Sequence, residues 1–305
     1  MNNTLVAKLS IFGLFFLTLI LGCSGGSKEK EPEIPIEPPA PPLEFTEIEF
    51  AGEQLFFVHG STLYASNLDG EFSVLKEDEA INGVGDYVVS MLRVYSPDGS
   101  FVSKEYLGNT TSLKGESVAY IVGENDEIIK LDATLTYPEI DISETMAFFG
   151  SIDIRTAVFH GDNLLLSFVD ENGGMNQYIN IENNFIQISG KRTLSVVASE
   201  NNDKLFISSS NHLYLFDYNS LNTTVFDSVL PTLVYRIDGD VYYSRGNELN
   251  RFNESIYSFD HVEIPDELGF INDAAHYEGF DYFATSTGIW KVDLANDIFE
   301  RLIEI

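Results

Sequence analysis

Four ionisable residues are the candidates for binding chemistry in this sequence: Arg155 in "IDIRTAVF", Arg236 in "LVYRIDG", Asp273 and His276. Only 17 residues are Lys or Arg, against 48 Asp or Glu, so an arginine within an apolar run is conspicuous. A guanidinium binds a carboxylate or a phosphate through paired hydrogen bonds. The alternative is that the two arginines only neutralise nearby acids such as Asp273. The sequence leaves both interpretations open.

Signatures of catalysis and of metal binding are missing from the pattern. The chain contains no G-x-S-x-G motif, and its five histidines never fall at His-x-x-x-His spacing. The stretch "DENGG" (170–174) departs from a calcium loop after its first position. With 48 carboxylates, no pair stands out as a glycosidase acid and nucleophile. We therefore predict no catalytic residue, no metal site and no cofactor, and favour binding over catalysis while leaving an enzyme open.

The net charge of −31 bears on the kind of partner. Nucleic-acid binding needs clustered Lys and Arg, so we expect no nucleic-acid partner. A strongly negative surface keeps a protein soluble and opposes self-association, which favours a monomer.

The N-terminal segment explains the only cysteine of the chain, Cys23. An apolar run from Leu9 to Leu21 precedes it, too short to span a bilayer of about 30 Å but long enough for the core of a secretory signal. A single cysteine also excludes a disulfide within the chain.

The residues "ILGCS" resemble the lipobox of bacterial lipoproteins. The resemblance implies cleavage after Gly22 and a lipid on Cys23, which would attach the protein to a membrane. Ser24 in the next position implies the outer membrane in that family, and "SKEKEPE" resembles the surface-export signals of Bacteroidota lipoproteins. Whether the protein faces the periplasm or the cell surface stays open.

Residues 24–42 hold six of the ten prolines and no repeating apolar face. Such a segment forms no packed core and favours extended polyproline II. We therefore divide the chain into a signal peptide (1–22), a lipidated cysteine with a disordered Pro-rich tether (23–42) and a folded domain (43–305).

The folded domain repeats one pattern of short alternating strands separated by Gly, Asn, Asp and Ser, for example in residues 54–75, 204–226 and 280–302. The third strand of each unit is marked by Leu63, Leu92, Ile128, Tyr178, Leu213, Leu249 and Ile289. From Leu63 to Ile289 the mean spacing is about 38 residues, which is typical of a four-stranded propeller blade.

We therefore predict an all-β protein, a β-propeller of seven blades with four short antiparallel strands each. Six blades result if residues 79–140 form one blade with an insertion. A pair of two-sheet sandwiches is the rival architecture. The last unit contains four strands of its own, so the ring is expected to close by packing of one blade on another. We expect Tyr64, Tyr214 and Trp290, at one position of their units, to lie between blades.

The stretch "YSPDGSFV" (95–102) resembles the blade signature of TolB-type, WD40-like propellers. Pairs such as "TLYASNLDG" and "HLYLFDYNS" resemble the degenerate propellers of Bacteroidota lipoproteins. We expect a lipid-anchored extracytoplasmic module that binds or scaffolds a protein or glycan partner. The alternatives are a glycan-active hydrolase or lyase at the channel mouth, and a component of a TolB-like envelope complex. In a propeller, Arg155, Arg236, Asp273 and His276 are expected to line the central channel.

Overall fold

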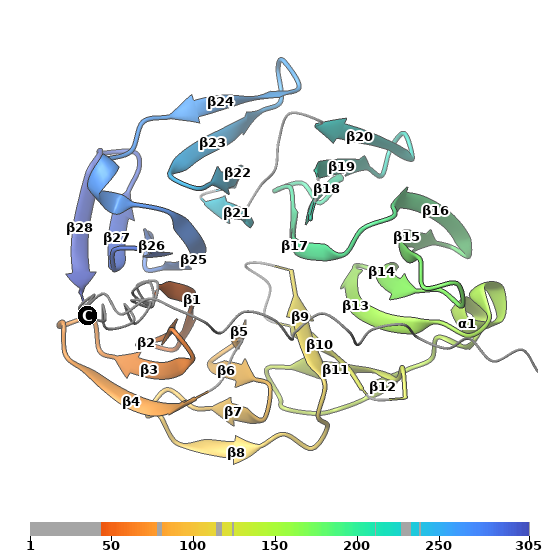
Figure 1. Cartoon of the computed structure of the whole chain (residues 1–305), viewed down its shortest axis with the longest axis horizontal. Coiled ribbons are helices and arrows are strands. Elements are labelled where there is room, and N and C mark those ends of the chain that lie inside the picture. Colours follow the sequence, from red (N-terminus) through yellow and green to blue (C-terminus); the bar gives the residue numbers. More distant parts are fainter. Residues whose placement is uncertain are drawn as a thin grey trace, which may run out of the picture. The chain divides into compact units, whose positions relative to one another are not determined.

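The computed structural model describes residues 44–77, 81–113, 118–123, 125–210, 212–226, 233–237 and 239–304. These residues form seven four-stranded antiparallel sheets arranged in a ring, which confirms the seven-bladed β-propeller (Figure 1). The six-bladed count and the pair of sandwiches are wrong. The predicted signal peptide, Cys23 and the tether lie outside the described residues. No helix among the described residues is long and apolar enough to cross a membrane.

Each blade is built from four consecutive strands. Blade 1 contains β1 (Phe45–Ala51), β2 (Gln54–His59), β3 (Thr62–Ser66) and β4 (Phe72–Glu77), and blade 2 contains β5 (Ile81–Val84), β6 (Tyr87–Ser90), β7 (Arg93–Tyr95) and β8 (Phe101–Ser103). Blade 3 contains β9 (Asn109–Ser112), β10 (Val118–Val122), β11 (Ile128–Asp132) and β12 (Glu139–Ile140), and blade 4 contains β13 (Asp153–His160), β14 (Asn163–Val169), β15 (Met175–Ile181) and β16 (Asn184–Ser189). Blade 5 contains β17 (Thr193–Ala198), β18 (Lys204–Ser209), β19 (Leu213–Asp217) and β20 (Asn222–Phe226). Blade 6 contains β21 (Leu233–Ile237), β22 (Asp240–Arg245), β23 (Glu248–Asn253) and β24 (Ser258–Val262), and blade 7 contains β25 (Ile271–Tyr277), β26 (Phe280–Thr285), β27 (Ile289–Asp293) and β28 (Ile298–Ile303).

The first strand of each blade lies nearest the centre of the ring (Figure 1). The predicted third-strand markers fall on third strands, except that Leu92 lies in the turn just before β7. Two local features explain the uneven spacing of the markers. Blade 2 has very short strands, and the helix α1 (Ser143–Phe149) is inserted between blades 3 and 4.

Apolar residues gather between blades, because neither face of a thin sheet is buried until a neighbour covers it. Seven hydrophobic clusters fill the seven interfaces between adjacent blades. As predicted, Tyr214 and Trp290 are buried in two of these clusters, and Tyr64 packs against a third. Each fully buried large side chain contributes about 1.5–3 kcal/mol, so the interfaces stabilise the ring.

The ring closes between blade 7 and blade 1 without a strand shared by the two ends of the chain. Blade 1 uses only N-terminal strands and blade 7 only C-terminal strands, as predicted. The cluster at this seam contains Phe45 and Phe57 from blade 1 and Tyr282 and Ile303 from blade 7. Apolar packing therefore closes the seam in the same way as the other six interfaces.

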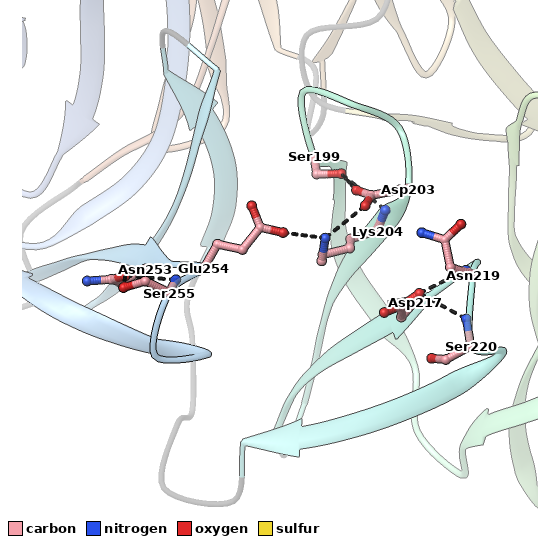
Figure 2. A network of polar contacts seen from close by, with 9 residues as sticks. All are labelled: Ser199, Asp203, Lys204, Asp217, Asn219, Ser220, Asn253, Glu254 and Ser255. Atoms are coloured by element: carbon pink, nitrogen blue, oxygen red, sulfur yellow. Dashed lines mark hydrogen bonds and ion pairs between the residues drawn. The ribbon is translucent and has the colours of Figure 1, made fainter.

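An ion pair between a buried lysine and an exposed glutamate adds a polar link between blades 5 and 6 (Figure 2). The Nζ atom of Lys204 lies 2.9 Å from Asp203 Oδ2 and 2.6 Å from Glu254 Oε1, and Glu254 belongs to the turn between β23 and β24. Burial acts to lower the pKa of Lys204, but the hydrogen bonds to the two carboxylates outweigh it and raise that pKa. Lys204 therefore stays protonated although its side chain is only 9% exposed.

Candidate functional site

A cavity of about 390 Å³ lies where the seven innermost strands converge. Every blade supplies at least one residue of its wall, so the cavity, here called the central cavity, occupies the axis of the ring. Its wall is formed by Thr46, Glu47, Ile81, Asn82, Met91, Gly108, Asn109, Thr110, Thr111, Ser112, Arg155, Thr156, Val158, Arg192, Thr193, Leu194, Ser195, Val196, Leu233, Asn272 and Asp273. The solvent-exposed members of this wall, here called the rim, are Thr46, Met91, Asn109, Arg155, Arg192 and Leu194.

Four innermost strands carry a β-bulge near their first residues. The pairing register shifts at Thr46 in β1, Arg155 in β13, Leu194 in β17 and Asn272 in β25. A bulge adds one unpaired residue, bends the strand and re-aims the side chain, and bulges are over-represented next to functional sites. All four bulged residues line the central cavity, so the same backbone device directs a side chain to this cavity from four blades.

Two arginines lie at the mouth of the cavity, and a lysine lies behind its wall. Arg155 forms an ion pair with Asp153 on the same strand, and both side chains are about half exposed. Arg192 precedes β17 on the exposed rim, and within the described part of the chain it has no charged partner. Lys104 is buried behind the wall, where its Nζ donates to Thr110 Oγ1 at 3.0 Å and to the carbonyl of Gly108 at 3.4 Å.

The carboxylates of the wall are engaged with the backbone of a neighbouring blade. Asp273 accepts a hydrogen bond from the N–H of Ile48 at 3.1 Å, and Glu47 accepts one from the N–H of Ile81. Ser195 takes the same role in blade 5, since its Oγ accepts from the N–H of Val234 at 3.0 Å. Each of these acceptors follows a bulge directly. The bulges therefore also link innermost strands that share no ladder.

The four predicted binding residues are thus divided between three places. Arg155 and Asp273 line the central cavity together. Arg236 lies on the innermost strand β21, half-buried, and is absent from the lining of the cavity. His276 lies on β25 but lines a second cavity, described next. Whether any of the four binds a ligand stays a prediction.

The second cavity, of about 400 Å³, is formed by the opposite ends of β1, β5 and β25. Its wall contains Glu49, Glu53 and Asp86 beside His276. The Nδ1 atom of His276 lies 2.8 Å from Oδ1 of the buried Asp281, which fixes the orientation of the ring. The rings of Phe50 and Tyr277 stack in the same wall, with their centroids 4.6 Å apart. This end of the ring is therefore acidic and aromatic, whereas the rim of the central cavity carries arginines.

Two cationic residues at the central cavity, Arg192 and Lys104, were not predicted from the sequence. Arg192 belongs to "GKRT" (190–193), a basic pair in a very acidic chain, and this pairing was the available signal. Nothing in the local sequence of Lys104 indicates that it lies behind a cavity wall. Among the described residues, no group of three or more His, Cys, Asp or Glu is placed to hold a metal ion.

Comparisons with known proteins address the fold. No family model and no curated protein matches the chain. A similar solved structure is the extracellular domain of a putative hybrid two-component system of B. thetaiotaomicron, with a TM-score of 0.58 and 12% identity over 82% of this chain and 38% of that chain. PorZ, a surface component of the type-IX secretion system of Porphyromonas gingivalis, gives a TM-score of 0.54 and 12% identity over 86% of this chain and 38% of that one.

A chain of the mitotic checkpoint complex is also similar, with a TM-score of 0.55 and 13% identity over 85% of this chain and 90% of that chain. For the two bacterial structures, the matched region covers only 38% of the solved chain, so this protein spans well under half of their length. At these identities the likeness shows the propeller fold alone.

Proposed function

We propose that this protein is an extracytoplasmic binding module, attached to the outer membrane by a lipid on Cys23, whose partner binds at the rim of the central cavity. The observation that carries the proposal is the convergence of four bulged residues, one from each of four blades, on one cavity. Three of the bulges also place an acceptor for a backbone N–H of the neighbouring blade. All four bring a side chain to the same cavity, where one partner can contact them together.

The location is supported by the order of charge, apolar run and cysteine at the N-terminus, which resembles a lipoprotein signal. Two of the similar structures are described as an extracellular domain and as a bacterial surface component. Binding at the rim agrees with the general rule that loops and strand ends on a rigid scaffold carry recognition.

Mass spectrometry of the mature protein tests the anchor. We expect the N-terminal residue to be Cys23 with attached acyl chains, and we expect the Cys23→Ser variant to leave the membrane fraction. An unmodified Cys23 in the mature wild-type protein would refute the anchor.

Site-specific photo-crosslinking in the source cells tests the binding face. A photoreactive amino acid replaces Met91 or Leu194 on the rim, which are 50% and 53% exposed. The matched controls are Val74 on β4 and Ile298 on β28, which are 65% and 52% exposed at the outer edge of the ring. We expect a discrete adduct from the rim positions alone. Equal crosslinking at the outer edge would contradict a partner at the rim.

One observation favours a second candidate, a glycan-active hydrolase or lyase. The second cavity combines Glu49, Glu53 and Asp86 with His276 and an aromatic wall. Carboxylates on both sides of a glycosidic bond are the usual apparatus of glycoside hydrolysis. The test is release of reducing ends from a panel of polysaccharides. The enzyme hypothesis requires activity in the wild type that Glu53→Gln abolishes, whereas inactivity across the panel supports the binding module.

A further inference from the structure

The hydroxyl groups in the central cavity indicate what kind of atom the occupant presents. Thr110 Oγ1 accepts a hydrogen bond from Lys104, Thr193 Oγ1 accepts one from Gln177 Nε2, and Ser195 Oγ accepts one from a backbone amide of β21. Each hydroxyl carries a single proton to donate. Within the described part of the chain, none of these three protons has an acceptor. The wall therefore offers three O–H donors to whatever enters.

The charged side chains of the central cavity, like its hydroxyl groups, favour a ligand that accepts hydrogen bonds. The guanidinium groups of Arg155 and Arg192 are donors only and lie on the exposed rim. The two acids of the wall, Glu47 and Asp273, already accept from backbone N–H groups. The Arg155–Asp153 pair is exposed on both sides and contributes little, so a ligand can take over the guanidinium. The rim thus offers two guanidinium groups beside the three hydroxyl donors of the wall, and an anionic acceptor complements this set.

Apolar groups lie beside these donors. Met91 and Leu194 belong to the rim, are about half exposed, and Leu194 is two residues from Arg192. No aromatic residue lines the central cavity among the residues that the structure describes, so a flat platform for a sugar ring is missing there. The C-terminal residue of a polypeptide carries a carboxylate and a side chain on one carbon, and therefore fits a donor cluster next to an apolar patch.

We propose that the central cavity binds the C-terminal end of a partner polypeptide. The α-carboxylate is held by Arg192 and Arg155 with the hydroxyl groups of the wall, and an apolar last side chain packs on Leu194 and Met91. Capture of a terminal carboxylate is a known mode of peptide recognition. This inference rests on the proposed function and adds the chemistry of the partner.

The direct test measures binding of dye-labelled hexapeptides by fluorescence anisotropy to the purified protein. The peptides end in each of the twenty amino acids and are made as free acids and as C-terminal amides. We expect the acids ending in Leu, Ile, Val or Met to bind best, and their amides to bind about tenfold to a hundredfold more weakly, as expected for loss of a charge-assisted hydrogen bond. Equal binding of acid and amide would overturn the carboxylate assignment.

Variants locate the site. Arg192→Ala is expected to weaken the best free acid about tenfold or more, with Arg192→Lys intermediate because an ammonium lacks the planar fork. Lys191→Ala is the matched control, since Lys191 is an exposed neighbouring cation outside the lining of the cavity. Thr110→Val removes one hydroxyl donor and is expected to weaken binding of the free acid. An equal loss in Lys191→Ala and Arg192→Ala would show general charge attraction and refute the site.

The result also separates the inference from the proposed function. Rim crosslinks without any preference for free acids would overturn the C-terminal ligand and leave the binding module standing. Displacement of the peptide by glucuronate, but not by acetate at equal concentration, would assign the cavity to acidic glycans and overturn the polypeptide. A loss of both rim crosslinks and peptide binding would remove both proposals.

Discussion

Asp273→Ala is the most informative single substitution, because Asp273 reaches across the interface between blade 7 and blade 1, where the ring of described strands closes. Its Oδ2 accepts a hydrogen bond from the N–H of Ile48, 225 residues away. Ile48 is fully buried and Asp273 is 4% exposed, so the N–H of Ile48 loses its acceptor at a site with little access to water. An unpaired buried N–H costs about 1–3 kcal/mol. In a domain of this size, each kcal/mol lowers the melting temperature by about 2–4 °C.

Urea unfolding followed by the fluorescence of Trp290 measures the loss in the free energy of unfolding. Hydrogen exchange at the amide of Ile48 gives the local readout, and its protection should fall by about 5- to 150-fold, the equivalent of 1–3 kcal/mol. Asp273→Asn retains an oxygen acceptor and should lose less. Ser195→Ala removes the corresponding acceptor inside the ring, where blades 5 and 6 are also joined by the chain, and should open that interface less.

Two results would contradict the role of Asp273 at the seam between blade 7 and blade 1. Unchanged exchange at Ile48 in the Asp273→Ala variant would mean that the hydrogen bond between the blades does not protect this amide. A loss of unfolding free energy below about 0.5 kcal/mol would place the substitution among ordinary surface changes. Either result would refute the assignment of Asp273 to ring closure.

The remaining predictions concern stability. The pKa of Lys204 is raised above its ordinary value of 10.5, so its contribution is complete below pH 10.5 and is lost as the pH rises through the folded-state pKa. The Lys204→Met variant should therefore have a lower free energy of unfolding than the wild type at pH 7 in urea, and this difference should shrink only at strongly alkaline pH. The Glu254→Gln variant should show a smaller loss of unfolding free energy than Lys204→Met, because Asp203 still pairs with the lysine. Gly108→Ala places a Cβ 2.1 Å from the carbonyl oxygen of Val122 and should cost about 2–5 kcal/mol in the same assay. Gly161→Ala, with φ +60° and no atom within 4 Å, should cost only about 1–2 kcal/mol, and equal losses for the two glycines would contradict the steric reason.

The fold was predictable from sequence because each blade repeats a local pattern. Alternation within strands and Gly, Asn or Asp in the turns are properties of neighbouring residues, so Leu213 and Ile289 could be assigned to third strands without any long-range information. The helix α1 was missed. It has seven residues and is held by the packing of Phe149 against blade 4, which is a tertiary contact with no counterpart in local periodicity.

The candidate site was only partly predictable, because it depends on which way side chains turn at the ends of strands. Arg155 lines the central cavity because it lies at a bulge, where the pairing of β13 with β14 shifts by one residue. Nothing in the neighbouring sequence predicts this shift. Arg236 has no such bulge on β21 and stays out of the lining of the cavity. Alternation of apolar and polar residues assigns a residue to a strand. A bulge inserts one unpaired residue, however, and so changes the face of the sheet on which the side chains before it lie.

The order of the blades around the ring also has a consequence for the order of folding. Since every blade is contiguous in sequence, the first six interfaces can form one after another from the N-terminal end. The seventh interface needs Ile303 of the last strand, and until it forms the apolar side chains of Phe45, Ile48, Leu55 and Phe57 have no partner from blade 7. A partly folded ring therefore presents one exposed apolar face until the last blade is in place, and this face is where a chaperone would be needed.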